Sequence, residues 1–112
     1  TDAPTLYFTR DSGPFLPYLN QVKSTAIALD WRVNLERARA LLGDRPVQGN
    51  LDPIALQAPE ELLREKVRSI LKQAGPKGHI FNLGHGCVPS TPIEGVATVI
   101  DEVKSWGDRH QP

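Results

Sequence analysis

The sequence predicts an α/β protein built from four consecutive βα units whose strands run parallel. Two observations lead to this fold class. Short runs of β-forming residues alternate four times with longer segments whose apolar residues recur at helical spacing. No low-complexity stretch, charge run or linker divides residues 1–112, so we treat the chain as a single segment.

The first unit has a clear strand and a less regular helix. Residues 5–9 are rich in β-forming side chains and end before the turn-forming residues 11–13. Pro14 and Pro17 are not expected to lie inside one helix, because proline lacks the backbone donor that a helix interior needs. We therefore expect the helix to run from about Pro17 to about Lys23.

The second unit is more regular. Residues 25–29 form a short, continuous apolar run, as expected for a strand buried on both faces of a parallel sheet. Asn34 is a good helix N-cap, and Gly43 is expected to end the helix. The expected apolar stripe of this helix comprises Leu35, Ala38, Leu41 and Leu42.

The third unit begins with a strand from about Pro46 to about Asn50. Pro59 is expected at the first position of its helix, and Gly75 is expected to close it. The apolar residues at helical spacing are Leu63, Val67, Ile70, Leu71 and Ala74.

The fourth unit places a strand at residues 79–83. Thr91 and Glu94 have the spacing of a capping box, in which each side chain bonds a free backbone N–H group at the helix start. The residues expected on one apolar face of this helix are Ile93, Val96, Ala97, Ile100 and Val103. Four such units fit either a small open sheet or half of an eight-stranded barrel, and periodicity leaves both open.

Charge and composition exclude several classes of partner. Thirteen basic and thirteen acidic residues cancel, so we expect neither nucleic acid nor an anionic membrane as a partner. The single cysteine, Cys87, has no second cysteine to pair with, which favours a reducing, cytoplasmic location. The chain has no methionine, so we do not expect Thr1 to be the start of translation.

Polar side chains follow all four expected strands. In parallel α/β folds, binding sites form where the carboxyl ends of the strands meet, so these residues predict a polar pocket. The alternative is that they cap helices or bond loop backbone. The segments are Arg10-Asp11, Asp30-Trp31-Arg32, residues 48–52 and residues 82–86.

His85 is the sharpest candidate among them, because the flanking Gly84 and Gly86 leave its imidazole unobstructed. It could donate to a carboxylate or titrate near neutral pH, and it could equally bond a neighbouring loop carbonyl. His79 and His110 are expected to be structural or solvated.

The remaining candidates concern packing and metal binding. Trp106 is expected to pack at the end of the last helix, and Trp31 could wall a pocket. His85 and Cys87 have a spacing that could supply two zinc ligands, but a site needs three or four, so we expect no metal. Familiar nucleophile, phosphate-loop and metalloprotease motifs are absent from the sequence.

Several of these segments together resemble the uroporphyrinogen decarboxylase family. They are Leu29-Asp30-Trp31, the Q-G-N-L-D-P run at 48–53, the N-L-G-H-G run at 82–86, and Thr91-Pro92. The resemblance runs from about Pro4 to Trp106 in matching order and spacing. It implies that the four units are the C-terminal half of a (βα)8 TIM barrel. Two departures are Pro46, where a strand-forming residue is usual, and Cys87, where an aliphatic residue is common.

The resemblance also implies a reaction. Family members remove the four acetate carboxylates of uroporphyrinogen III as carbon dioxide and give coproporphyrinogen III in haem biosynthesis. They act without metal or organic cofactor, as cytosolic homodimers. His85 matches the histidine of the family's substrate cleft, so it is the expected substrate-binding residue. The family's arginine-rich segment, aspartate and tyrosine lie in the earlier half, so no catalytic residue is expected in this chain.

Two expectations about partners follow, and one about activity. The tetrapyrrole substrate and the N-terminal half of the barrel should complete the site, and this chain alone should be inactive. One alternative is a corrinoid-dependent methyltransferase of the same barrel, with Cys87 as a zinc ligand, although residues 8–10 lack the His-x-Cys it needs. The other is a non-catalytic half-barrel that associates through its open edges. The roles of Arg10, Arg32, Asp30 and Asp52 stay open.

Overall fold

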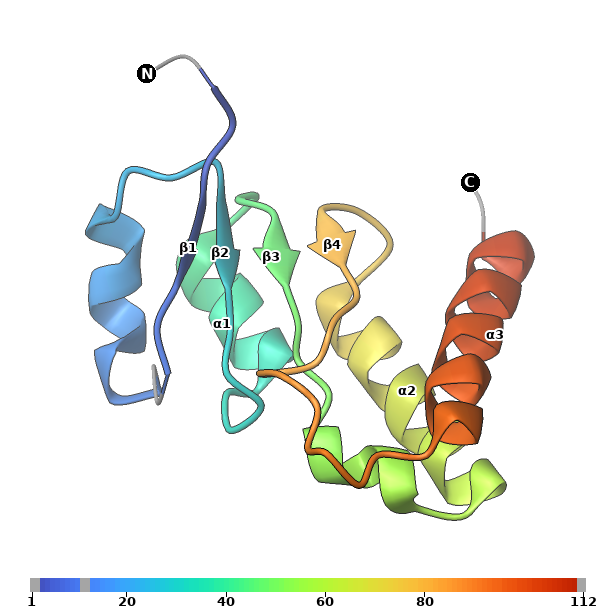
Figure 1. Ribbon diagram of the computed structural model, residues 1–112. Coiled ribbons are helices and arrows are strands. Elements are labelled where there is room, and N and C mark those ends of the chain that lie inside the picture. Colours follow the sequence, from blue (N-terminus) through green and yellow to red (C-terminus); the bar gives the residue numbers. More distant parts are fainter. Residues whose placement is uncertain (1–2, 11–12, 111–112) are drawn as a thin grey trace.

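Four parallel strands form a single sheet, in the order in which they occur along the chain (Figure 1). We describe residues 3–10 and 13–110 of a computed structural model, so Thr1, Asp11 and Ser12 lie outside the described residues. The strands are β1 (Leu6–Phe8), β2 (Ala26–Ala28), β3 (Val47–Gln48) and β4 (His79–Ile80). All four lie inside the expected ranges and are shorter, with an additional parallel bridge between Leu51 and Leu83. The prediction of four parallel strands is confirmed.

The two faces of the sheet differ, as the alternation of side chains along β2 shows. Ile27 and Leu29 are fully buried in an apolar cluster with the helix that follows β2. Ala26 and Ala28 alternate with them and therefore point to the opposite face. That opposite face carries exposed apolar side chains at Leu6, Phe8 and Ile80. The helices thus cover one face, and Figure 1 shows α1 and α2 behind the sheet.

The first helix differs from expectation. It is a 3₁₀-helix, η1 (Gly13–Gln21), and it contains both Pro14 and Pro17. The expectation that both prolines could not share the helix was wrong, because the backbone angle fixed by proline is compatible with short 3₁₀ turns. Leu16 and Leu19 anchor this helix to the core.

Helix α1 (Leu35–Leu42) has the predicted ends. The Asn34 side chain accepts from the backbone N–H of Arg37 at 2.9 Å, and Gly43 follows the last turn with a φ of 65°. Leu35, Ala38 and Leu42 are buried. Leu41, expected in the same stripe, lies at its edge and is exposed.

Helix α2 (Glu60–Ala74) also ends as predicted, at Gly75. Pro59 is the residue before the helix rather than its first position. A short 3₁₀-helix, η2 (Pro53–Gln57), precedes it and was not expected. Of the predicted apolar positions all but Ile70 are buried; those buried are Leu63, Val67, Leu71 and Ala74.

Helix α3 (Ile93–Arg109) overturns two expectations. Thr91 does not cap the helix, because its hydroxyl donates instead to the Val88 carbonyl at 2.7 Å. The expected apolar face is also largely exposed, with Ile93 83% accessible. The buried positions are Gly95, Val99 and Glu102.

The orientation of α3 has a steric cause. A Cβ atom at Gly95 would lie 2.2 Å from the Leu56 carbonyl oxygen, so only glycine allows this approach to η2. That contact turns Val99 toward the core and leaves Val96 and Ile100 lining an open apolar groove of about 350 Å³. Among residues 3–10 and 13–110, no helix combines the length and apolarity needed to cross a membrane.

Glu102 joins α2 to α3 as a buried carboxylate, 2% exposed. Its Oε1 accepts from Arg64 at 3.2 Å and from Arg68 at 3.1 Å, and its Oε2 accepts from Arg109 at 3.1 Å. Burial alone would raise the pKa of this carboxyl, but the hydrogen bonds from Arg68, Arg64 and Arg109 outweigh burial and hold the pKa below its ordinary 4.5. The ionised Glu102 carboxylate of α3 therefore links this helix to Arg64 and Arg68 of α2.

Replacing Glu102 with alanine should lower the free energy of unfolding by about 3 kcal/mol, because three guanidinium groups lose a buried partner. Chemical denaturation would measure this loss. Asp101→Ala is the matched control, since Asp101 bonds Arg64 from an exposed position, and it should cost less than about 1 kcal/mol. Equal losses of unfolding free energy in the two variants would contradict the role of Glu102 in joining α2 to α3.

The Glu102 carboxylate also predicts how the stability of the fold changes with pH. Since the folded pKa lies below 4.5, the unfolded chain binds this proton more readily. Its stabilisation is complete above pH 4.5 and is lost as the pH falls through the folded value. The melting temperature should drop over this acid range, and it should drop less in Glu102→Ala.

Candidate functional site at the carboxyl ends of the strands

A hollow of about 400 Å³ opens on the sheet face that the helices leave uncovered. All four strands or the segments after them contribute to its walls. The lining residues are Leu6, Phe8, Ala28, Gln48 and residues 82–87. The hollow thus brings together Gln48, Asn82 and His85, from the third and fourth of the four polar segments expected to form a pocket; the described polar residues of the first two segments do not line it.

His85 lies in the connection from β4 to α3, half-buried against this hollow. Its Nδ1 lies 3.1 Å from the carbonyl oxygen of Gly86, the loop contact considered from the sequence. Among the described residues no hydrogen bond reaches the other ring nitrogen, Nε2. The ring is therefore placed by its own loop while one nitrogen stays available on the hollow.

Gly84 fixes where that loop runs. A Cβ atom at this position would lie 2.2 Å from the backbone nitrogen of Trp31, so any larger residue would displace one of the two segments. The Gly84 N–H donates to the Leu51 carbonyl at 2.8 Å. The loop of β4 is therefore seated on the segments that follow both β2 and β3.

The segment after β2 is itself braced by buried polar groups. Asp30 is 0% exposed, and its Oδ1 accepts from the Arg32 N–H at 2.9 Å. The Asn50 amide donates to the carbonyls of Asp30 and Val33. Asp30 Oδ2 has no hydrogen-bond partner among the described residues.

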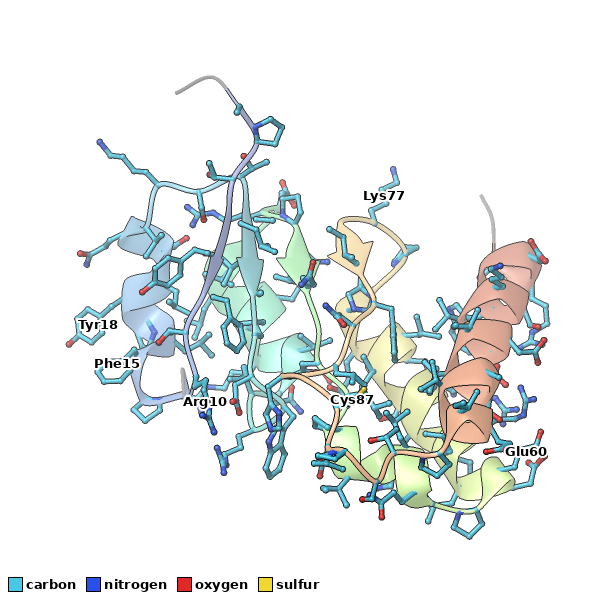
Figure 2. The ribbon with its side chains drawn as sticks, viewed as in Figure 1. Arg10, Phe15, Tyr18, Glu60, Lys77 and Cys87 are labelled. Atoms are coloured by element: carbon cyan, nitrogen blue, oxygen red, sulfur yellow. The ribbon has the colours of Figure 1, made fainter. Side chains whose placement is uncertain are left out.

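Other strand-end candidates serve the loops rather than the hollow. Asp52 accepts from the Ile54 N–H at 3.0 Å and so caps η2. The Arg32 guanidinium lies 4.6 Å from the Trp31 ring centroid, on a separate depression that also contains Lys66. Trp31 therefore does not wall the hollow. Arg10 is exposed beyond the end of β1 (Figure 2).

Cys87 has an exposed thiol on the margin of the hollow, where the chain turns from β4 toward α3 (Figure 2). Within the part of the chain that is described, no group of three or more His, Cys, Asp or Glu side chains could hold a metal ion.

The other two histidines have structural surroundings. His79 Nε2 lies 2.6 Å from the Gly49 carbonyl oxygen, and its ring meets Phe81 edge-on. Burial lowers the pKa of His79, nearby Arg39 lowers it further, and the hydrogen bond to Gly49 opposes both. His110 stacks on Trp106 at the end of α3, with 3.9 Å between ring centroids.

No residue of the first strand was assigned to the apolar wall of the hollow by the sequence reasoning. Leu6 and Phe8 form this wall from β1, and Phe8 pairs with Ala28 of β2. Their spacing of two residues is the signal that could have found them, because it places both on one face of the strand.

Comparison with known proteins identifies relatives over nearly the whole chain. A family model described as uroporphyrinogen decarboxylase (URO-D) matches residues 1–106. A protein named uroporphyrinogen decarboxylase from Carboxydothermus hydrogenoformans is 47% identical over 105 residues, covering 92% of this chain and 30% of that protein. One of the same name from Sorangium cellulosum is 44% identical over 107 residues, covering 94% of this chain and 31% of that protein. The chain thus spans about 30% of the length of the relatives it matches.

A solved structure shows the same fold. A methyltransferase from Methanosarcina mazei superposes with a TM-score of 0.79 at 16% identity, covering 94% of this chain and 32% of that chain. At this identity the likeness concerns the fold alone. Together with the parallel sheet it confirms the prediction of four βα units from a TIM barrel.

His79 should make stability fall as the pH decreases. Its folded pKa lies below its ordinary 6.5, so the unfolded chain takes up this proton first. The stabilisation is complete above pH 6.5 and is lost as the pH falls through the folded value. Melting temperatures measured on either side of pH 6.5 should differ less in His79→Gln, which cannot titrate, than in the unmodified protein. An equal difference in both would contradict the assignment.

Proposed function

The chain belongs to the uroporphyrinogen decarboxylase family, and on that premise we propose that it supplies four βα units of a carboxy-lyase. The complete enzyme would remove the four acetate carboxylates of uroporphyrinogen III and give coproporphyrinogen III. The observation that carries the proposal is the hollow at the strand ends, where His85 lies beside Asn82 and Gln48. A cytoplasmic location, a homodimer and a place in haem biosynthesis belong to the same proposal.

The chemistry of the hollow suits this reaction. Decarboxylation of a pyrrole acetate requires protonation of the ring and stabilisation of charge as carbon dioxide leaves. Fixed donors in a site shielded from water meet that need without a nucleophile. The His85 imidazole and the Asn82 amide would provide two such donors, and Leu6 and Phe8 an apolar wall, once the earlier barrel units cover the hollow.

The rest of the site would come from the units that precede these four in a barrel. An octacarboxylate substrate calls for several cationic groups, and the described lining of the hollow contains no arginine or lysine. The family resemblance assigns the arginine-rich segment, an aspartate and a tyrosine to those earlier units. The exposed apolar residues of β1 and β4 lie at the two edges where such units would join.

This chain alone should therefore show no decarboxylase activity, because electrostatic stabilisation built from several groups is lost when most of them are missing. The purified 112-residue chain should give no coproporphyrinogen from uroporphyrinogen, and the complete barrel should. Turnover by the chain alone would contradict the proposal. A complete barrel that binds stoichiometric zinc or transfers methyl groups instead would favour the methyltransferase alternative.

In the complete enzyme, His85→Ala and His85→Asn should slow turnover by about ten- to a hundredfold. Loss of one hydrogen-bond donor to a charged partner costs roughly 1–3 kcal/mol, and about 1.4 kcal/mol is a tenfold change in rate. The melting temperature should stay nearly unchanged, because His85 lies at the hollow rather than in the core.

His110→Ala is the matched control, because that ring lies at the end of α3 away from the hollow. Its activity should equal that of the unmodified enzyme. If His85→Ala instead lowers the melting temperature and leaves activity per folded molecule unchanged, His85 has a structural role.

A further inference from the structure

Asn50 has a buried side chain that the proposed reaction does not use. It is 4% exposed and lies two residues after the end of β3. Its Nδ2 donates to the Asp30 carbonyl at 2.8 Å and to the Val33 carbonyl at 2.5 Å. These carbonyls lie at the two ends of a turn that the Val33 N–H also closes, by donating to Asp30 at 3.1 Å. One amide group therefore ties the turn after β2 to the segment that follows β3.

The loop that follows β4 packs on the turn that Asn50 holds. Trp31 lies within it, and Gly84 packs so closely on the Trp31 backbone that a Cβ atom would not fit. Leu51, the residue after Asn50, accepts the Gly84 N–H at 2.8 Å. Asn50 is thus linked to Gly84 in two ways: through the turn that contains Trp31, and through Leu51, its neighbour in sequence.

His85 comes next in the chain after Gly84. Its own loop contact, to the Gly86 carbonyl, is local and does not tie the loop to the sheet. Toward β3 the loop is fixed by the Leu51 bridge, in which the Leu51 N–H donates to the Asn82 carbonyl at 3.1 Å and the Gly84 N–H donates to Leu51. Toward the turn after β2 it is fixed by the close approach of Gly84 to Trp31. The position of the imidazole relative to β2 therefore depends on the turn that Asn50 braces.

We propose that Asn50 is a positioning residue for His85. This proposal rests on the proposed function, because it concerns His85, the residue expected to contact the substrate. An asparagine suits the position, since its amide offers two hydrogens to two carbonyl oxygens. A carboxylate of the same shape would offer neither and would repel both oxygens.

A double-mutant cycle in the complete enzyme tests this coupling. Asn50→Ala should lower kcat/KM by about ten- to a hundredfold, because a small displacement of an orienting group costs that much. In the His85→Ala background the same change should cost less than about twofold, because the group that it positions is gone. An equal loss with and without His85, or no loss at all, would overturn the proposal.

Asn34→Ala is the matched control. Asn34 is also an asparagine that bonds backbone, but its side chain caps α1 by accepting from the Arg37 N–H. It should lower the melting temperature and leave kcat/KM per folded molecule unchanged. A comparable loss of kcat/KM in Asn34→Ala would show that general destabilisation explains the effect, and this too would overturn the proposal.

Gly84→Ala supplies a second test if Asn50→Ala fails to fold. It leaves the hydrogen bonds of Asn50 intact and pushes the loop away from Trp31. It should lower kcat/KM by about ten- to a hundredfold, again only when His85 is present. A full loss in the His85→Ala background, or unchanged kcat/KM, would overturn the proposal.

An NMR measurement separates this proposal from the proposed function. The imidazole signal of His85 in the complete enzyme should shift in Asn50→Ala and stay in place in Asn34→Ala, whatever the substrate is. An unchanged His85 signal in folded Asn50→Ala contradicts the positioning role. An unmodified enzyme that leaves uroporphyrinogen intact, with a shifted signal in Asn50→Ala, contradicts the reaction alone.

Discussion

The contact between Gly84 and the backbone of Trp31 is the constraint on which the strand-end geometry depends. It brings the loop of β4 onto the turn after β2, across the segment that follows β3. Three strand ends are thereby joined at one point, although β2 and β4 are not neighbours in the sheet. The Asn50 amide holds the turn beneath this contact. The hollow and the placement of His85 follow from that junction.

At the other end of the sheet, where the strands begin, arginine side chains rather than close backbone contacts hold the segments together. Arg39 of α1 donates to the backbone carbonyls of Ala74, Arg45, Lys77 and Gly78. Arg45 donates to carbonyls at the end of η1. These bonds satisfy helix-end and loop carbonyls around the amino ends of the strands. In a (βα)8 barrel, residues at the amino ends of the strands are expected to serve stability, and residues at the carboxyl ends to serve the chemistry.

The order of elements could be predicted from the sequence because each strand and helix is encoded locally, by apolar spacing and by ends such as Asn34 and Gly43. The orientation of α3 could not, because it depends on a close approach of Gly95 to η2 and on the buried Glu102. The arginines of Glu102 that lie on α2 are 34 and 38 residues away in sequence, beyond any local pattern. The place of His85 was predictable from its strand end. The bracing roles of Asp30 and Asn50 were not, because a strand-end amide or carboxylate can serve a ligand or a loop equally well.

The central claim is that the uncovered face of the sheet at the strand ends receives the tetrapyrrole. A crystal structure of the complete enzyme with coproporphyrinogen bound would test it most directly. The product should lie over the hollow formed by Leu6, Phe8 and Gln48, with His85 Nε2 within hydrogen-bonding distance of it. A product bound elsewhere, with the hollow filled by protein side chains, would contradict the claim.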